Sequence, residues 1–198
     1  YKILPPNSDK SFTAILINYC HKKNITLLLP TSDRDLSLLI KKRNLLKENG
    51  IKVLMSSNSS INECLSNFSF TDVCIENSIP MPKMYRLISE IEFPCVAKLD
   101  FSQGAKGVFF IENEKELEKI LEKYNFSEMI FQEYINSNEY SIDAFYGNKG
   151  KFIAAIARHR VEVRNGESVV TVTKDIPELV PFAESLSSVF NFWGHITI

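Results

Sequence analysis

An excess of charge of either sign is absent from this sequence. Its 198 residues carry 23 Lys and Arg against 24 Asp and Glu, which gives a formal net charge of −1. Nucleic acids and anionic membranes attract proteins with a dense basic surface, and this balanced composition supplies none. We therefore expect no nucleic acid and no membrane among the partners.

Long apolar runs are absent as well. The longest covers residues 152–157, whereas roughly 20 apolar residues are needed to cross a bilayer. The chain opens without a basic stretch followed by an apolar one, so a secretion signal is not expected. Residue 1 is Tyr rather than Met, which indicates a stretch cut from a longer chain.

Cysteine and histidine are scarce and show no ligand spacing. The four cysteines form no CxxC pair, and the three histidines lie far apart, so they are expected to be surface or packing residues. A chain of this length buries enough surface to fold without disulfides, so we expect free, buried thiols in a reducing, cytoplasmic compartment. The residues concerned are Cys20, Cys64, Cys74, Cys95, His21, His159 and His195.

The remaining composition is that of a globular protein, and the chain divides into three zones. In the first zone, apolar runs alternate with amphipathic stretches, which predicts a parallel sheet with right-handed crossovers. The apolar run at 25–29 is typical of a strand covered on both faces. The expected elements are strands at 1–4, 25–29 and 51–55 and helices at 12–23 and 32–49, the second ending at Gly50.

The later zones follow a different pattern. Residues 59–91 are expected to be helical, interrupted by the proline-rich connector 79–82, after a Ser and Asn cluster that marks a turn. Beyond them, short strands and hairpins with two covering helices predict an α+β arrangement. The expected elements are strands at 95–99, 107–111, 129–131, 140–146, 151–157 and 194–198 and helices at 114–124 and 175–190.

Lys98 is the first candidate binding residue. On a strand it shares a face with Val96, and a lysine on a rigid strand can direct its charge at a phosphate. The small-residue loop at 104–107 follows, and such a loop lets backbone N–H groups approach an anion. Lys98 alone also fits a half-exposed surface residue, and the loop alone fits a plain turn. Together they predict phosphate binding.

A second candidate follows the strand at 129–131. An adenine ring needs one donor and one acceptor in a flat apolar slot, which extended backbone at a strand exit can provide at residues 132–135. Glu139 lies four residues further and could accept hydrogen bonds from the two ribose hydroxyls, although a solvated turn glutamate fits equally.

Three arginines, Arg158, Arg160 and Arg164, follow at even spacing. They fit either the charged outer face of an edge strand or a set that holds a phosphate or carboxylate.

These segments occur in an order found in one family. The chain resembles the ATP-grasp superfamily, and within it the ATP-binding module of the carbamoyl phosphate synthase large chain and related carboxylate ligases. The matching stretches are 79–82, 94–98, 104–107, 132–135, 139–143 and 164–168.

The resemblance implies both fold and activity. The fold would combine α/β and α+β parts: a partial Rossmann-like (pre-ATP-grasp) domain at 1–58 and a C-terminally incomplete ATP-grasp domain at 59–198. ATP and Mg²⁺ would be the cofactors and a small carboxylate the substrate. In the implied reaction ATP converts the carboxylate into an acyl phosphate, which an amine or similar nucleophile attacks.

The same resemblance assigns roles to residues. Lys98 would contact the α- and β-phosphates, over which the loop at 104–107 would close. Gln132 and Glu133 would lie at the adenine through backbone groups, Ile135 would donate its N–H to the ring, and Glu139 would hold the ribose. The implied nucleotide-binding set is Lys98, Gly104, Ala105, Lys106, Gly107, Gln132, Glu133, Tyr134, Ile135 and Glu139.

Two departures from the family pattern stand out. Ser66-Asn67 occupies the place of an Asp-Lys pair, so either a phosphate contact is lost or the alignment is shifted. The family's Mg²⁺ ligands begin at the Gln of a Gly-x-x-x-x-Gln strand, and residues 194–198 match its first five positions. We therefore expect the metal ligands beyond residue 198, assign no metal-binding or catalytic residue here, and expect this segment alone to be inactive.

Two other functions remain open. A grasp-like module that binds nucleotide without chemistry is favoured by Asn67. A doubly wound dinucleotide or nucleotide-sugar protein would place the site in the first zone, which lacks a GxGxxG motif. The acceptor substrate and the oligomeric state are not specified by the sequence.

Overall fold

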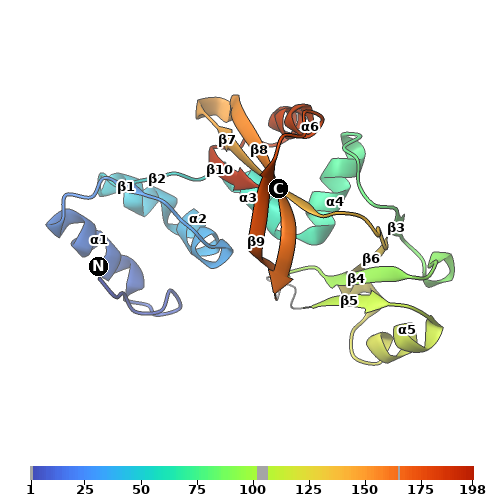
Figure 1. Cartoon of the computed structure of the whole chain (residues 1–198). Helices are drawn as coiled ribbons and strands as arrows, with labels where there is room; N and C mark the ends of the chain where they lie inside the picture. Colours follow the sequence, from blue (N-terminus) through green and yellow to red (C-terminus); the bar gives the residue numbers. More distant parts are fainter. Residues whose placement is uncertain (1, 102–106, 165) are drawn as a thin grey trace.

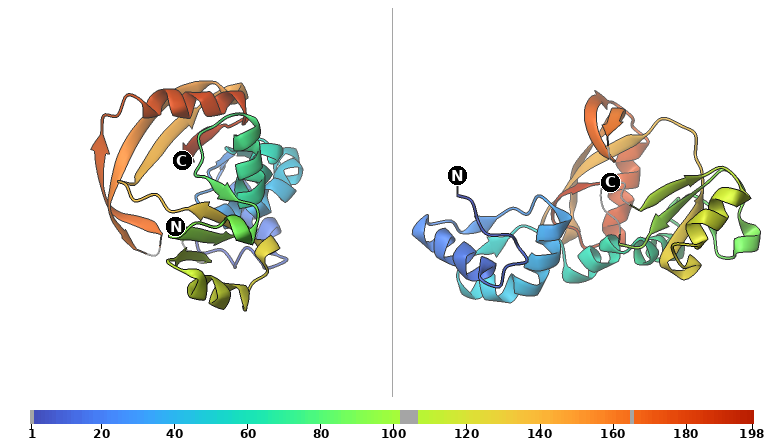
Figure 2. Two further views of the ribbon diagram at one scale, coloured as in Figure 1. Left: turned by 90° about the vertical axis from the view of Figure 1, so that its right-hand side faces the viewer. Right: turned by 90° about the horizontal axis from the view of Figure 1, so that it is seen from below.

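The computed structural model describes residues 2–101, 107–164 and 166–198. The described residues form a small parallel sheet and two four-stranded antiparallel sheets (Figure 1). The parallel sheet lies at one end of the molecule, one antiparallel sheet lies in the middle, and the other lies at the opposite end (Figure 2). This mixture confirms the predicted combination of α/β and α+β structure.

The first zone has the predicted alternation of helices and parallel strands. Ser32 caps the second helix by accepting a hydrogen bond from Asp35 N, and Gly50 follows that helix with a φ of +74°. The two strands pair in parallel, with Leu27 opposite Lys52. The elements are α1 Phe12–Lys22, β1 Leu27–Leu28, α2 Asp33–Glu48 and β2 Lys52–Val53.

Two predictions for this zone are wrong. Residues 2–4 form no strand, because no strand in the described part of the chain pairs with them. The run at 25–29 is not covered on both faces: Leu27 is 50% exposed and Leu29 62% exposed. Among the described residues, β2 is the only strand that pairs with β1, which leaves one edge of β1 uncovered.

The middle zone is helical only in its first half. α3 (Asn58–Leu65) and α4 (Asn67–Glu76) are capped by Ser57 and Ser66. After the proline-rich connector the chain forms β3 (Met84–Tyr85) and a short 3-10 turn, η1 (Ile88–Glu90), instead of the predicted helix. β3 lies along β6 (Met129–Glu133), whose available edge fixes the extended conformation.

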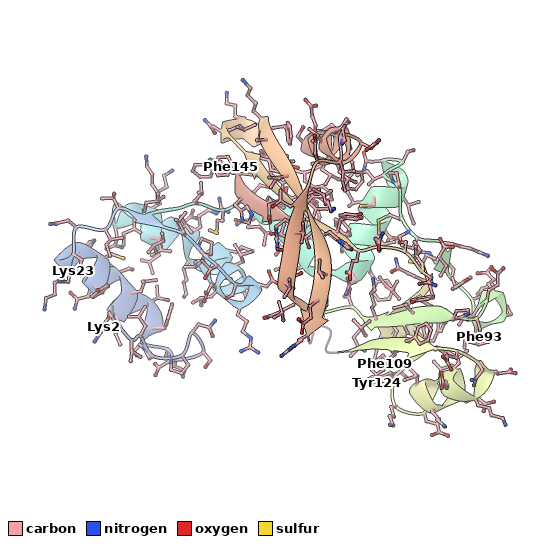
Figure 3. The ribbon with its side chains drawn as sticks, viewed as in Figure 1. Lys2, Lys23, Phe93, Phe109, Tyr124 and Phe145 are labelled. Atoms are coloured by element: carbon pink, nitrogen blue, oxygen red, sulfur yellow. The ribbon has the colours of Figure 1, made fainter. Side chains whose placement is uncertain are left out.

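The first antiparallel sheet has the strand order β3-β6-β4-β5. β4 (Cys95–Leu99) and β5 (Val108–Ile111) form the predicted hairpin, and α5 (Glu114–Leu121) packs on the sheet, as predicted. Asn113 caps α5, and a 3-10 turn, η2 (Phe126–Glu128), leads into β6. Phe109 and Tyr124 lie together on the α5 side of the sheet, with ring centroids 5.5 Å apart (Figure 3).

The second antiparallel sheet has the order β10-β7-β8-β9. β7 (Tyr140–Tyr146) and β8 (Phe152–Arg164) are joined by the predicted turn, here a 3-10 segment, η3 (Asn148–Gly150). β9 (Glu167–Lys174) continues the sheet, and β10 (Gly194–Thr197) pairs with β7. α6 (Leu179–Ser185) and η4 (Leu186–Ser188) pack on this sheet.

Two expectations for this sheet need correction. β8 is not an edge strand, because β7 and β9 flank it, and it extends to Arg164 rather than ending at residue 157. The last helix begins at Leu179 rather than at residue 175, which places Pro181 in its first turn, where a missing N–H costs no helical hydrogen bond.

Each of the three sheets packs around its own apolar cluster, and three of the four cysteines lie in these clusters. Cys20, Cys74 and Cys95 are buried free thiols, but Cys64 is exposed, contrary to the prediction. Tyr146 is fully buried and donates a 2.6 Å hydrogen bond to the carbonyl of Ala183 in α6.

A buried serine junction joins the first zone to the end of the chain. Ser56 and Ser60 are 4% and 2% exposed, and their hydroxyls accept hydrogen bonds from the backbone N–H of Trp193 (3.1 Å) and Asn191 (3.0 Å). Ser57 N donates to the carbonyl of Asn191 at 3.2 Å. The predicted turn is therefore a packed contact, and the domain boundary between 58 and 59 stays a prediction.

Candidate functional site

The two faces of the β3-β6-β4-β5 sheet differ in chemistry. One face packs against α5 through a buried cluster that includes Ala97, Ile111 and Phe131. The register places Lys98 opposite Val108 and Ile130, so these three share the other face. Val108 and, two residues on, Phe110 are 39% and 50% exposed, which leaves an apolar surface around Lys98.

Lys98 lies in a partly desolvated position on the face of the sheet opposite to α5. Burial lowers the pKa of its ammonium, and the Glu139 carboxylate acts in the opposite direction by favouring the charged form. No hydrogen bond contributes to this shift. Two of the predicted residues, which lie 41 positions apart in the sequence, are thus coupled through their charges.

Only one end of the predicted phosphate loop lies in the described residues. Gly104, Ala105 and Lys106 lie outside them. Gly107 has a φ of +81°, and its carbonyl accepts a 2.9 Å hydrogen bond from Leu99 N. A Cβ at this position would lie 2.8 Å from a methyl group of Leu99, so glycine is required where the hairpin closes.

The segment after β6 was predicted to bind adenine. Gln132 is 4% exposed and lies opposite Val96, on the same face as Lys98. Glu133 binds the backbone of Lys83: its N–H donates to the Lys83 carbonyl at 2.9 Å, and its Oε1 accepts from Lys83 N at 2.7 Å. The backbone beyond it enters no strand until β7.

Tyr134 and Ile135 extend this surface beyond the end of β6. Tyr134 meets the Phe110 ring edge-on at 4.7 Å, and the two residues are 42% and 50% exposed. Ile135 is 55% exposed, and within the described residues its N–H donates to no backbone carbonyl. An exposed apolar surface beside an available backbone donor is what a flat heteroaromatic ring requires.

Glu139 and Arg160 form an ion pair at the start of the second sheet. Arg160 Nη1 donates to Glu139 Oε1, and Arg160 N donates to the Glu139 carbonyl at 2.9 Å. Arg160 also donates to Ser168 Oγ at 2.8 Å and to the Gly166 carbonyl at 2.7 Å. The Arg160 guanidinium is thus occupied within the protein, and the Glu139 side chain remains 61% exposed.

The other two predicted arginines do not join this pair. Arg158 donates through Nε and Nη2 to the Asp143 carboxylate on β7, and this pair lowers the pKa of Asp143. Arg164 pairs with Glu162 of its own strand, and its side chain is 71% exposed. The three arginines therefore have three separate partners.

Sequence reasoning missed a polar cluster centred on Asp143. Its Oδ1 also contacts His195 Nε2 at 3.2 Å and accepts a hydrogen bond from Thr197 Oγ1 at 3.1 Å. Both residues lie on β10, which pairs with β7 so that Thr197 is opposite Asp143. The available signal was the alternation of His195 and Thr197 on a strand, but the pairing of β10 with β7 was not predicted.

Asn67 occupies a structural position. Its Nδ2 donates to the carbonyls of Leu99 (2.9 Å) and Asp100 (2.8 Å), at the end of the strand that carries Lys98. Ser66 Oγ and Phe68 N both donate to Asp100 Oδ1, at 2.8 and 3.0 Å. Ser66, Asn67 and the N–H of Phe68 thus hold α4 against the end of β4.

Two surface cavities lie away from these residues. One of about 830 Å³ is lined by α1, α2 and the segment before α1, and includes Lys10, His21 and Lys42. One of about 320 Å³ lies beside α6 and is lined by residues such as Ile156 and Leu179. Neither includes Lys98 or Glu139, so the candidate site rests on the side chains described above.

The described part of the chain contains neither a cluster of potential metal ligands nor a membrane-spanning helix. Within residues 2–101, 107–164 and 166–198, no group of three or more His, Cys, Asp or Glu side chains is placed to hold a metal ion. No helix in the described part of the chain is both long and apolar enough to span a bilayer.

The sequence profile of the ATP-grasp domain matches residues 66–198, which is more than half of the chain. The chain therefore belongs to the ATP-grasp family, as the order of its motifs predicted.

Known proteins are similar over different lengths. The carbamoyl phosphate synthase large chain of Clostridium acetobutylicum is 24% identical over 174 residues, covering 77% of this chain and 16% of that protein. A biotin carboxylase–β,γ-ATP complex from Campylobacter jejuni has a TM-score of 0.74 and 16% identity, covering 96% of this chain and 49% of that one.

A further solved structure shows the same fold. The biotin carboxylase domain of Hydrogenobacter thermophilus 2-oxoglutarate carboxylase, in complex with MgADP, ADP and bicarbonate, has a TM-score of 0.72 and 13% identity. The match covers 99% of this chain and 49% of that one. The likeness thus includes the first zone, and the chain spans about half the length of these structures.

Proposed function

We propose that this protein binds ATP and uses it to activate a carboxylate for ligation. The proposal rests on Lys98: it shares a sheet face with the exposed side chains of Val108 and Phe110, and the neighbouring strand of that sheet leads to an available backbone donor at Ile135. Family membership and the nucleotide-bound structures of similar fold support it.

The residues present suit the parts of the nucleotide. Lys98 would contact the phosphates, for which a charged donor without an internal hydrogen bond is suited. The adenine would lie on the apolar face beside Phe110 and Tyr134, with Ile135 donating from its backbone. Glu139 would accept from the ribose through its exposed carboxylate.

In the proposed reaction a carboxylate oxygen attacks the γ-phosphorus of ATP, and ADP leaves. The resulting acyl phosphate is attacked by an amine or similar nucleophile, which displaces phosphate. Lys98 would stabilise the negative charge of the phosphates during the transfer. The resemblance to the family implies that the Mg²⁺ ligands lie beyond residue 198, so we assign no step to the metal.

We further propose a cytoplasmic, reducing compartment and a small carboxylate substrate such as bicarbonate. All four cysteines are free thiols, which is compatible with a reducing environment. Bicarbonate is bound in one of the structures of similar fold.

A nucleotide-binding module without chemistry is the second candidate. It is favoured by Asn67, whose amide is held by backbone carbonyls rather than being available to a phosphate. One experiment separates the two. The complete protein is assayed for phosphate release from ATP with bicarbonate or other small carboxylates, alongside calorimetric ATP binding. Carboxylate-dependent release supports the ligase, binding without release supports the module, and absence of binding refutes both.

A further inference from the structure

Arg160 is held by more partners than any other guanidinium described above. Its side chain is 14% exposed, and each of its three nitrogens donates to a protein oxygen. Two partners, Ser168 and Gly166, belong to the β8–β9 hairpin, and the third is the Glu139 carboxylate. An arginine in this arrangement presents a fixed donor toward Glu139.

The backbone strengthens the same contact. Arg160 N donates to the Glu139 carbonyl at 2.9 Å, immediately before the register pairs Tyr140 with His159. Glu139 therefore lies at the point where the extended segment after β6 enters the second sheet. Its position is set from β8 and from the hairpin rather than by its own neighbours in sequence.

We propose that Arg160 is a positioning residue, which orients Glu139 so that the protein selects a ribonucleotide over a deoxyribonucleotide. The inference rests on the proposed ATP binding and extends it to the sugar. It differs from the sequence-based expectation that Arg160 contacts a phosphate or substrate directly: three of its five N–H groups already donate within the protein, one of them to Glu139.

The carboxylate chemistry allows both contacts at once. Arg160 engages Oε1, and a carboxylate offers about four acceptor sites over its two oxygens, so Oε2 remains for a ribose hydroxyl. The Glu139 side chain is 61% exposed and without Arg160 would sample several rotamers. Fixing such a side chain before binding removes an entropic cost equivalent to about two- to tenfold in affinity.

The positioning role differs measurably from a general electrostatic one. Loss of a positive charge near the phosphates would weaken ATP and 2′-deoxy-ATP by the same factor. Loss of Glu139 orientation would weaken ATP alone, because 2′-deoxy-ATP lacks the hydroxyl that Glu139 accepts from. The ratio of the two dissociation constants therefore isolates the proposed role.

The test uses calorimetry on the complete protein with ATP, 2′-deoxy-ATP and 3′-deoxy-ATP. The variants are Arg160→Gln, Arg160→Lys, Glu139→Gln and Ser168→Ala. Arg86→Gln is the matched control, because Arg86 also pairs with a carboxylate, Asp72 at 2.6 Å, on the surface. Thermal unfolding of each variant confirms that it is folded.

The wild type is expected to prefer ATP over at least one deoxynucleotide by about tenfold or more, the value of a hydrogen bond to a charged acceptor. Glu139→Gln should reduce that ratio to about threefold or less, and Arg160→Gln should reduce it by about two- to tenfold. Arg160→Lys and Ser168→Ala should give intermediate ratios, and Arg86→Gln should match the wild type.

Three results would overturn the inference. One is Arg160→Gln weakening ATP and both deoxynucleotides by the same factor, which would mark a phosphate contact. Another is Arg160→Gln leaving all affinities unchanged. The third is a wild type that binds ATP without preference over either deoxynucleotide, whereas a wild type that does not bind ATP would refute the proposed function as well.

Discussion

Replacing Lys98 by Met is expected to separate nucleotide affinity from stability. Met keeps an unbranched apolar side chain, so the packing of the Lys98 stem beside Val108 and Ile130 is largely retained while the charge is lost. A hydrogen bond between a lysine and a phosphate contributes about 1.5–3 kcal/mol. ATP affinity should therefore fall by about 10- to 150-fold.

The effect on stability has the opposite sign. Burial lowers the pKa of Lys98, so the unfolded state binds this proton more tightly than the folded state does. The charged Lys98 therefore destabilises the folded state. This destabilisation is fully present at pH values below the pKa of Lys98 in the folded state and disappears above its pKa in the unfolded state, about 10.4. At pH 7 the variant is thus expected to be at least as stable as the wild type, and the difference should shrink as pH approaches 10.4.

Calorimetric titration with ATP and urea unfolding at pH 7 and pH 10 measure the two effects on the complete protein. Lys119→Met is the matched control, because Lys119 is exposed on α5, on the other side of the same sheet. An unchanged ATP affinity in a folded Lys98→Met variant would refute the assignment of this lysine. A clear loss of stability at pH 7 would refute the argument from its pKa.

Three further substitutions test the fold around the site. Tyr146→Phe leaves a buried carbonyl of α6 unpaired and should lower the unfolding free energy by about 1–2 kcal/mol in urea titrations. Because burial raises the pKa of Tyr146 to about 12, wild-type stability should also fall as pH rises from about 10 to about 12. Asp143→Asn should cost about 2 kcal/mol at pH 7 and progressively less as pH falls below 3.8 and through the lowered pKa of Asp143, since Arg158 lowers that pKa and the contribution of the pair is lost on acidification. Gly194→Ala should lower the melting temperature by several degrees, because Gly194 has a φ of +93° and an added Cβ would lie 3.0 Å from Leu54 Cγ.

Elements with strong local signals were predictable from sequence. The β4–β5 hairpin and α5 have apolar strand runs, a glycine at the hairpin closure and an Asn cap at residue 113, and all three elements are confirmed. β3 was not predictable, because a two-residue strand has no periodicity and exists only through its pairing with β6. β9 had a local signal in its alternating Val and Thr residues, which the interpretation of β8 as an edge strand obscured.

In the candidate site, too, features with a local sequence signal were predictable and features that depend on strand pairing were not. Lys98 and Glu139 follow from the order of the motifs, and the Glu139 carboxylate favours the charged form of Lys98. The contacts of Glu139 with Arg160 and of Asp143 with His195 depend on strand register across 21 and 52 positions. Register is set by the whole sheet, so no local pattern could specify these partners.

The serine junction sets an order of events during synthesis. Its side-chain hydrogen bonds join residues 131 and 137 positions apart, Ser60 with Asn191 and Ser56 with Trp193. Closing a loop of that length costs roughly 4 kcal/mol of chain entropy, whereas each hydrogen bond contributes about 1 kcal/mol. The junction therefore forms only together with the pairing of β10 on β7. Until residues 191–197 have emerged from the ribosome, the hydroxyls of Ser56 and Ser60 lack these backbone partners, and the amino-terminal zone is not yet joined to β10.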